Sequence, residues 1–379
     1  MYRVLGPAAL VWCATGSLCL LLAARAAEPN DAKSAHPLWD GQETIEHYAK
    51  RTNLPPTKTL DLGNGVNLEL VLIPAGKFIM GTPEPKPVDE DGSGKKIVVG
   101  QAVFAVGIGV LLVLIGTVII RAIRQRRRPQ YSLAQFILMM LAASVAVLGG
   151  MHWWFSTRKL AQAQVEYSAA LARYGSSDKW EKPAHEVTLT TPFYIGRCEV
   201  MQEQYAQVMG GNASQFKGAS LPVEEVSWND ATEFCMKVGE KTGQTVRLPT
   251  EAEWEFACRA GTTTTYCSGD SEADLGRAAW YKMNSNSTPH PVGQREPNAW
   301  GVYDMHGNVW EWCQDFYWWY KPEAAVNPQG PPEGQSRVLR GGSWGLAPWF
   351  CRSAYRYAYF PDDRPRYVGF RMVVVERQR

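Results

Sequence analysis

Two long uncharged stretches constrain this chain most. Residues 97–120 and 133–155 contain no Asp, Glu, Lys or Arg, and each is long enough to cross a bilayer as a helix. Five arginines lie between them, from Arg121 to Arg128, and positive residues favour the cytoplasmic side of a membrane. The sequence therefore predicts two membrane-spanning helices, residues 96–120 and 132–155, joined by a cytoplasmic loop at 121–131. A helical hairpin buried in a soluble core is disfavoured, because it would place five arginines at its tip.

The first 26 residues resemble an export signal. Arg3 is followed by an uncharged run to Ala24, and Ala24-Arg25-Ala26 has the small-x-small pattern of a cleavage site. An uncleaved anchor is the alternative. Either way we expect a protein of the cytoplasmic membrane whose main domain lies outside the cytoplasm, in the periplasm or at the cell surface. Disulfides persist there, and fifteen pairings are possible among the six cysteines after the signal: Cys198, Cys235, Cys258, Cys267, Cys313 and Cys351.

The charge balance excludes one class of partner. The net charge is only +2, and five of the positive charges belong to the short run that ends at Arg128. The remainder has no basic face, so we expect no nucleic-acid partner.

The apolar hairpin interrupts a soluble domain. We expect a polar linker at residues 27–60, a first part of the domain at 61–95, a stalk at 156–183 and the main part at 184–379. Strands are predicted on both sides of the insertion, at 67–73, 77–81 and 185–190. Antiparallel helices return the chain close to its point of departure, so the insertion is expected to behave as a long surface loop between Gly81 and His185.

Helix signals continue along the main part of the domain. Short helices are expected near 42–50 and at 202–208. Ser227 is a predicted N-cap for a helix that runs to about Lys241, and Thr250-Glu-Ala-Glu253 is a capping box for the next helix. Beyond Gly261 we expect loops and short strands.

A loop rich in aromatic residues carries the clearest chemical signal. It is Asn298-Ala-Trp-Gly-Val-Tyr-Asp-Met-His-Gly-Asn-Val-Trp-Glu-Trp312. Gly301 and Gly307 permit left-handed backbone angles, and Asp304 and Glu311 supply carboxylates. With loop carbonyls between them, these could gather oxygen ligands around Ca²⁺. Equally, Glu311 could be a structural carboxylate that caps backbone amides or pairs with an arginine such as Arg340 or Arg352.

Eight sequence blocks in one order resemble the formylglycine-generating enzyme, or sulfatase-modifying factor, family. Besides the loop above, they include Ile73-Pro-Ala-Gly, Pro192-Phe-Tyr-Ile-Gly196, Leu221-Pro-Val, Arg247-Leu-Pro-Thr-Glu-Ala-Glu-Trp-Glu255, Arg340-Gly-Gly-Ser-Trp344 and Gly369-Phe-Arg371. The resemblance implies the family's compact α+β fold, related to C-type lectins and poor in regular secondary structure, here with the inserted two-helix hairpin. It also implies a structural calcium ion held by Asp304, Gly307, Val309 and Glu311, with Gly307 and Val309 contributing carbonyls.

The family's catalytic metal pair is not found at its usual spacing. Active members hold Cu(I) with Cys-x-x-x-x-Cys shortly after Gly-Gly-Ser, and soft Cu(I) requires both thiolates. Here the segment offers only Cys351, with Leu346 and Arg356 five residues to either side. Cys351 could pair with Cys313 in a disulfide, which we favour, or share copper with it. The candidate catalytic residues are thus Cys351, Cys313, Ser343 and Trp310.

Two functions follow from this resemblance. The favoured hypothesis is a membrane-tethered, calcium-stabilised binding module that holds a peptide, protein or glycan in an aromatic groove near Trp310, Trp344 and Trp349. The alternative is a copper-dependent oxidase that converts a sulfatase cysteine to formylglycine.

Overall fold

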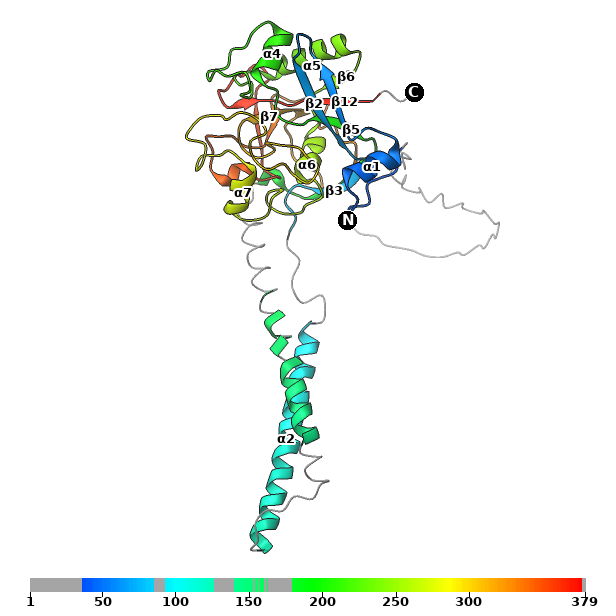
Figure 1. The fold of residues 1–379 in the computed structure, drawn as a ribbon, viewed down its shortest axis with the longest axis vertical. Helices are drawn as coiled ribbons and strands as arrows, with labels where there is room; N and C mark the ends of the chain where they lie inside the picture. The colour runs from blue at the N-terminus through cyan, green and yellow to red at the C-terminus, as the bar shows by residue number, and fades with distance from the viewer. Residues whose placement is uncertain are drawn as a thin grey trace, which may run out of the picture.

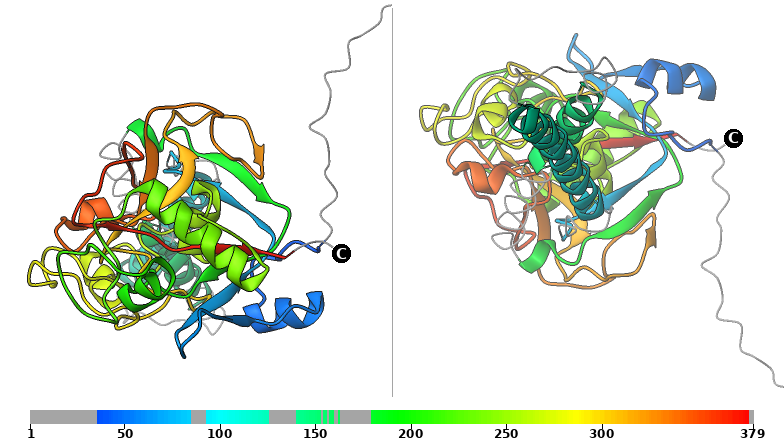
Figure 2. Two further views of the ribbon diagram at one scale, coloured as in Figure 1. Left: turned by 90° about the horizontal axis from the view of Figure 1, so that it is seen from above. Right: turned by 90° about the horizontal axis from the view of Figure 1, so that it is seen from below.

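The computed structural model describes residues 36–84, 93–125, 140–152, 154–155, 157–159, 162 and 179–376. Figure 1 shows a globular part and a pair of helices that extend away from it. Seen from below, the helix pair lies in front of the globular part (Figure 2). The expected signal at 1–26 lies outside the described residues, as does most of the expected stalk at 156–183.

The helix pair leaves the globular part between two paired strands. Strand β3 (Gly76–Met80) is antiparallel to β4 (His185–Leu189), and Met80 is directly opposite His185. The two ends of the insertion also contact each other, because Thr82 donates from its amide to the Glu181 carbonyl (3.1 Å) and from its hydroxyl to the Glu181 carboxylate (2.6 Å). The expectation that the chain returns to where it left is confirmed.

The two helices pack through small residues. Helix α2 spans Ser93–Gln125, and residues 140–152 are also helical. A Cβ on Gly107 would lie 2.7 Å from the Ala146 nitrogen, and one on Gly149 would lie 2.7 Å from the Phe104 nitrogen, so the backbones approach closely. Within the described residues, one helical stretch, Val103–Arg121, is long and apolar enough to cross a membrane, with a mean hydropathy of 3.0. The second expected span, at 132–155, is described only in part and is not confirmed.

Three small sheets build the globular part. The first has the order β1 (Thr57–Asp61), β2 (Asn67–Ile73), β5 (Phe193–Gly196), β12 (Val373–Val375) and β6 (Thr245–Arg247), all antiparallel. The second has the order β10 (Arg356–Tyr359), β9 (Arg337–Arg340), β7 (Trp310–Phe316) and β11 (Val368–Gly369), with β11 parallel to β7. The third has the order β3, β4 and β8 (Ala325–Val326), with β8 parallel to β4 on the side opposite β3.

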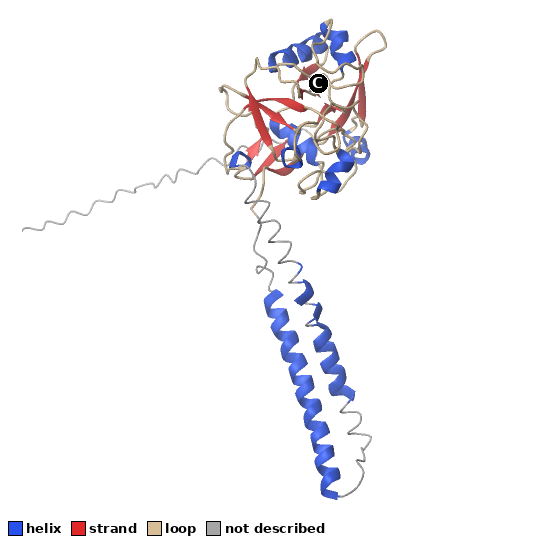
Figure 3. Ribbon diagram, turned by 90° about the vertical axis from the view of Figure 1, so that its left-hand side faces the viewer, coloured by secondary structure: helices blue, strands red, loops and turns tan. Residues whose placement is uncertain are grey.

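The helices of the globular part follow their capping signals closely. Helix α4 is Gln202–Met209, α5 is Trp228–Thr242 with Ser227 as its N-cap, and α6 is Glu251–Arg259 with Thr250 as its N-cap. Helix α7 (Glu272–Ala278) was not expected, although Ser271 and Asp274 form a capping box at its start. Loops make up much of the remainder (Figure 3), as the resemblance implied.

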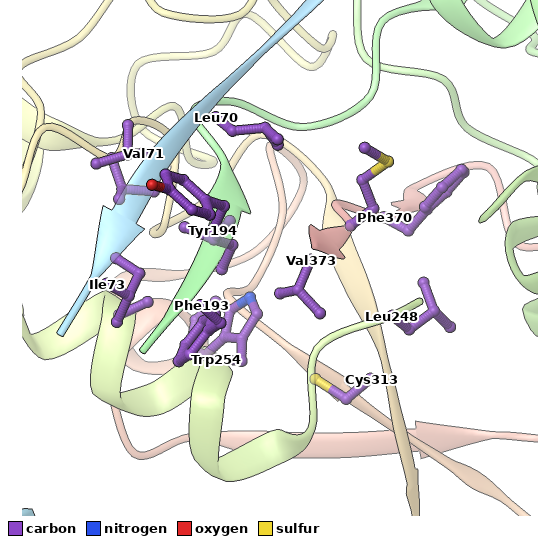
Figure 4. Close-up of a cluster of buried hydrophobic side chains, with 14 of the residues drawn as sticks. Leu70, Val71, Ile73, Phe193, Tyr194, Leu248, Trp254, Cys313, Phe370 and Val373 are labelled. Carbon is purple, nitrogen blue, oxygen red and sulfur yellow. The ribbon is translucent and has the colours of Figure 1, made fainter. Parts of the chain in front are cut away.

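The hydrophobic core joins segments from both sides of the insertion. Figure 4 shows Ile73 of β2 close to Phe193 of β5 and Trp254 of α6, with Leu70 farther along the same strand. The expected linker at 27–60 is wrong for its described part. Helix α1 (Ile45–Thr52) buries Tyr48 in this core, and β1 pairs with β2 along its whole length. Apolar residues in an otherwise polar segment were enough to anchor it.

Candidate functional site

The loop at 298–312 has the irregular backbone that its composition predicted. Gly301 and Gly307 have φ of 83° and 76°, and Asp304 and Asn308 have φ of 55° and 51°. A Cβ on Gly307 would lie 2.1 Å from the Trp280 carbonyl oxygen, so only glycine fits there. The loop then enters β7, which carries Trp310 and Glu311 into the core.

Glu311 is a structural carboxylate in this structure. It is fully buried, and Arg371 donates to both of its oxygens, from Nε and Nη2, at 2.6 Å each. Trp254 Nε1 donates a third hydrogen bond at 2.7 Å. The arginine partner is Arg371 rather than the two that we considered from sequence.

Asp304 is buried with one oxygen satisfied. Its Oδ2 accepts a hydrogen bond from the Gly293 amide (2.7 Å), whereas its Oδ1 has no partner among the described residues. Burial raises the pKa of Asp304 to about 6. Glu199 lies next to it and accepts from Asn308 Nδ2 (2.7 Å) and the Val309 amide (3.0 Å). Burial first, and the Asp304 charge second, raise the pKa of Glu199 well above its usual value.

The sequence did not point to Glu199 or Arg371 as partners of this loop. Glu199, Asp304 and Glu311 form a buried set of carboxylates that influence one another, and Arg371 is the arginine that offsets their charge. Glu199 is separated from the loop by about a hundred residues, and no motif signals the contact. In the part of the chain that the structure describes, no cluster of three His, Cys, Asp or Glu side chains is arranged around a metal position. The four residues expected to bind Ca²⁺ therefore fit it only in part. Asp304 has an oxygen that accepts no hydrogen bond from the described residues and is free to bind an ion, whereas both oxygens of Glu311 already accept hydrogen bonds.

The expected Cys313–Cys351 disulfide is wrong. Both residues are free thiols and both are buried, but they belong to different clusters of side chains. Cys313 lies in the main core, near Leu248 and Val373 in Figure 4. Cys351 packs with Tyr266 and its neighbours in the smaller cluster.

The two thiols do not form a copper site either. Burial raises the pKa of Cys351 to about 12 and that of Cys313 well above its usual value, which favours the neutral thiol over the thiolate that a metal requires. Among the described residues, His306 contacts a single thiol: its Nε2 is 3.7 Å from Cys258 Sγ and also accepts from the Cys267 amide (3.0 Å), whereas its Nδ1 contacts the Cys351 carbonyl (2.7 Å). The donor set therefore does not fit the family's two-thiolate copper centre.

The expected aromatic groove is also wrong in two of its three members. Trp310 is 2% exposed and Trp344 is 6% exposed, so neither offers a free face to a ligand. Ser343 is buried as well, and its Oγ has no hydrogen-bond partner among the described residues. The Trp310 ring packs against the rings of Tyr355 and Tyr357 instead of facing solvent.

Trp349 does line a pocket. The pocket has a volume of about 530 Å³ and lies between the start of the insertion and the segment that carries Cys351. Its walls include Thr264, Tyr266, Trp349 and Arg352. The Arg352 guanidinium stacks 3.7 Å from the Trp349 ring and pairs with Glu181, which fixes this wall in place. The Cys351 thiol is fully buried behind it.

The sequence profile of the sulfatase-modifying factor enzyme 1-like domain matches residues 151–376, more than half of the chain. The chain belongs to this family. The mixed helix and sheet architecture agrees with it, and the family that the sequence motifs suggested is confirmed.

Two kinds of curated relative stand out. The chain is 36% identical over 211 residues to the chaperone protein LppX of Paenibacillus barcinonensis, covering 42% of this chain and 71% of that protein. It is 31% identical over 213 residues to the formylglycine-generating enzyme of Mus musculus, covering 52% of this chain and 54% of that enzyme. For the Streptomyces coelicolor enzyme the identity is 38% over 167 residues, covering 40% and 51%. The chain thus spans about half the length of these enzymes.

Solved structures of similar fold include Treponema denticola variable protein 1. It has a TM-score of 0.51 and 31% identity, and the match covers 53% of this chain and 90% of that chain. PvdO from Pseudomonas aeruginosa has a TM-score of 0.54 and 23% identity over 85% of this chain and 99% of that one. At that identity the likeness to PvdO shows the fold alone.

Proposed function

We propose that this member of the sulfatase-modifying factor family is a membrane-tethered, exported binding module rather than a formylglycine-generating oxidase. The main support for this proposal is that the thiols of Cys351 and Cys313 are not arranged to bind copper. Cys351 is a buried thiol whose pKa is raised to about 12, and Cys313 lies in a different cluster. A two-thiolate centre cannot be assembled from them without rebuilding the core.

A peptide or protein is the ligand that we propose, ahead of a glycan. A chaperone acts by binding other proteins, and this chain covers 71% of the chaperone LppX but only 54% and 51% of the two formylglycine-generating enzymes described above. The pocket walled by Trp349, Tyr266 and Thr264 has the aromatic surface and hydroxyl groups that such a ligand requires. Its volume of about 530 Å³ suits a few side chains of a bound segment.

The proposed tether is the helix pair. The apolar stretch Val103–Arg121 is only 6% buried, so its surface would be covered by lipid. Close backbone contact through Gly107 and Gly149 is typical of helix packing in membranes, where small residues let helices approach. With Arg121 and the arginines after it on the cytoplasmic side, the globular part would be exported.

We also propose that Ca²⁺ stabilises the loop at 298–312. Asp304 Oδ1 and the carbonyls of Gly307 and Val309 would hold it, whereas Glu311 would have to leave Arg371 to take part. An ion bound only by the folded state raises its melting temperature. We expect a chelator to lower the Tm of the full chain by a few degrees, and Asp304→Asn to remove that sensitivity. A Tm that does not respond to chelator would contradict calcium binding.

A Cu(I) competition assay tests the binding-module proposal. The purified full chain would be titrated against a colorimetric Cu(I) chelator under reducing conditions. We expect the chelator to remove all copper from the wild type and from Cys351→Ser alike. Stoichiometric retention of Cu(I) by the wild type, lost in Cys351→Ser, would instead support the oxidase.

A further inference from the structure

The globular part contains a second cleft with its own lining residues. It has a volume of about 420 Å³ and is bounded by the start of α6, the edge of the third sheet and the chain that follows β7. Its walls include the aromatic and proline side chains of Phe316, Trp318, Trp319, Tyr320, Pro331 and Pro332. The charged side chains of Lys321, Glu323 and Arg356 also line it. None of these belongs to the pocket beside Trp349. We call this second cavity the tryptophan cleft.

The aromatic wall of the tryptophan cleft is both exposed and held in place. Trp318 is 56% exposed and Trp319 is 43% exposed, which is unusual for the largest apolar side chain. Trp319 stacks on Trp180 with ring centroids 3.5 Å apart, so its orientation is fixed from behind. Tyr320 is fixed by a hydrogen bond from its hydroxyl to Glu251 at 3.1 Å. Trp319 is thus both exposed and held, and its free face is available to a ligand at little ordering cost.

The cleft also contains a carboxylate, Asp315, that forms no ion pair within the described part of the chain. Asp315 is 4% exposed and lines the cleft. Its Oδ2 accepts a hydrogen bond from the Glu251 amide at 2.9 Å, but none of the described residues donates to its Oδ1 or forms an ion pair with it. Burial, together with the charge of Glu251, raises the pKa of Asp315 to about 7, although the charge of Arg356, which lines the same cleft, acts to lower it.

Neighbouring carboxylates each have their own arginine. Arg356 pairs with Glu251, and Arg340 pairs with Glu255. Arg247 pairs with Glu253 through two hydrogen bonds of 2.7 and 2.8 Å. A buried carboxylate is costly unless a cation offsets it. Asp315 differs from the others because no arginine among the described residues forms an ion pair with it, and a cationic ligand could supply that pair.

We propose that the tryptophan cleft binds the cationic side chain of a basic peptide segment, with its guanidinium or ammonium group on Asp315 and its stem against the tryptophan rings. Aromatic faces attract cations, and this fold already uses the same chemistry, because Arg356 lies 4.0 Å from the Tyr320 ring while it pairs with Glu251. Strand β8 is the last strand of its sheet and also lines the cleft, so one edge of its backbone faces away from β4. An extended peptide can pair with such an edge.

Two matched peptides test the proposal at pH 8, where Asp315 is ionised. They are acetyl-Gly-Arg-Gly-amide and its neutral counterpart with citrulline, titrated into the full chain in detergent and followed by calorimetry and tryptophan fluorescence. We expect the arginine peptide to bind at least about tenfold more tightly, the usual effect of a charged hydrogen bond. Equal affinities, or no binding of either peptide at millimolar concentration, would overturn the proposal.

Variants separate this site from a general effect on folding. Asp315→Asn keeps an oxygen for the Glu251 amide and removes the unpaired charge, so we expect it to lose the preference for arginine without loss of Tm. Trp318→Ala should weaken the arginine peptide, whereas Glu186→Gln and Phe360→Ala, both exposed and outside the cleft, should leave its affinity unchanged. Wild-type affinity in Asp315→Asn would also overturn the proposal. The result does not depend on the pocket beside Trp349, so either proposal can fail alone.

Discussion

Buried ion pairs hold together the loop-rich globular part. Arg371 pairs with Glu311, Arg340 with Glu255, and Arg352 with Glu181, and all of these side chains are at most 8% exposed. Each arginine also donates to backbone carbonyls: Arg371 Nη1 donates to Gly196 and Arg340 Nη1 to Ala354. Because few regular elements cross the core, these side chains take over part of the role that sheet hydrogen bonds have in other folds.

Removing one partner of such a pair should be costly. Glu311→Gln leaves the Arg371 charge buried and without its carboxylate, and we expect a loss of about 3–5 kcal/mol in the free energy of unfolding. Glu296→Gln removes an exposed pair with Arg277, which solvent screens, and should have a much smaller effect. Denaturant unfolding of the two variants measures both. A loss below about 1 kcal/mol for Glu311→Gln would show that Arg371 finds another partner.

Glu224 gives a pH-dependent prediction. It is fully buried, its Oε2 has no partner among the described residues, and burial raises its pKa to about 7. Because the pKa of Glu224 is higher in the folded state, folding favours its protonated form. The contribution of Glu224 to stability is therefore present in full below about pH 4.5 and is lost as the pH rises through about 7. We therefore expect Glu224→Gln to raise Tm at pH 8 and to have a smaller effect at pH 5. Thermal melts at both pH values check this, and a lower Tm at pH 8 would contradict it.

At the scale of elements, most helices and strands could be predicted because their signals are local. Ser227 and Thr250 start α5 and α6 where their capping side chains place them, and the apolar run at β2 marks a central strand. The helix expected near 42–50 is present as α1, but its packing on the core and the strand β1 were missed, because the polar composition hides the few residues, such as Tyr48, that enter the core. Pairing across the insertion, Met80 with His185, followed from the geometry of an antiparallel hairpin.

The contact between the two long helices can be tested with cysteine pairs. A Cβ on Gly150 would lie 3.0 Å from the Phe104 ring, so cysteines at these two positions should form a disulfide under mild oxidation. The matched control pairs Phe104→Cys with Met151→Cys, because Met151 is 51% exposed. Trypsin cleaves after the arginines that follow α2, and a linked pair would remain one species on a non-reducing gel. Equal linkage in the control would contradict the packing.

At the scale of the whole molecule, the family and the fold were within reach of sequence reasoning, but the site was only partly so. The motifs revealed the loop that contains Asp304 and Glu311. They could not show that Arg371 forms an ion pair with Glu311, or that Trp310 and Trp344 are buried, because those facts depend on contacts between distant segments. Nothing in the sequence indicates that Asp315 lacks an ion-pair partner among the described residues. That follows only from the structure, in which the nearby arginines pair with other carboxylates.

The proposed orientation across the membrane can be tested by labelling in intact cells. If the globular part is exported, a cysteine introduced at Gln125, the last residue of α2, should be shielded from an impermeant thiol reagent, and one at Lys179 should react. The unmodified chain, in which the six cysteines of the described residues are buried or half-buried, gives the background. Reaction at Gln125 with protection at Lys179 would reverse the orientation.

Incubation of the full chain with a sulfatase-type peptide, Cu(I), O₂ and reductant tests the central claim most directly. The claim is that Cys351 and Cys313 lie in separate clusters and cannot form the metal centre of an oxidase. Mass spectrometry of the peptide would follow its cysteine. We predict that the cysteine remains unchanged with copper present or absent. Copper-dependent conversion of that cysteine to formylglycine, abolished by Cys351→Ser, would contradict the account.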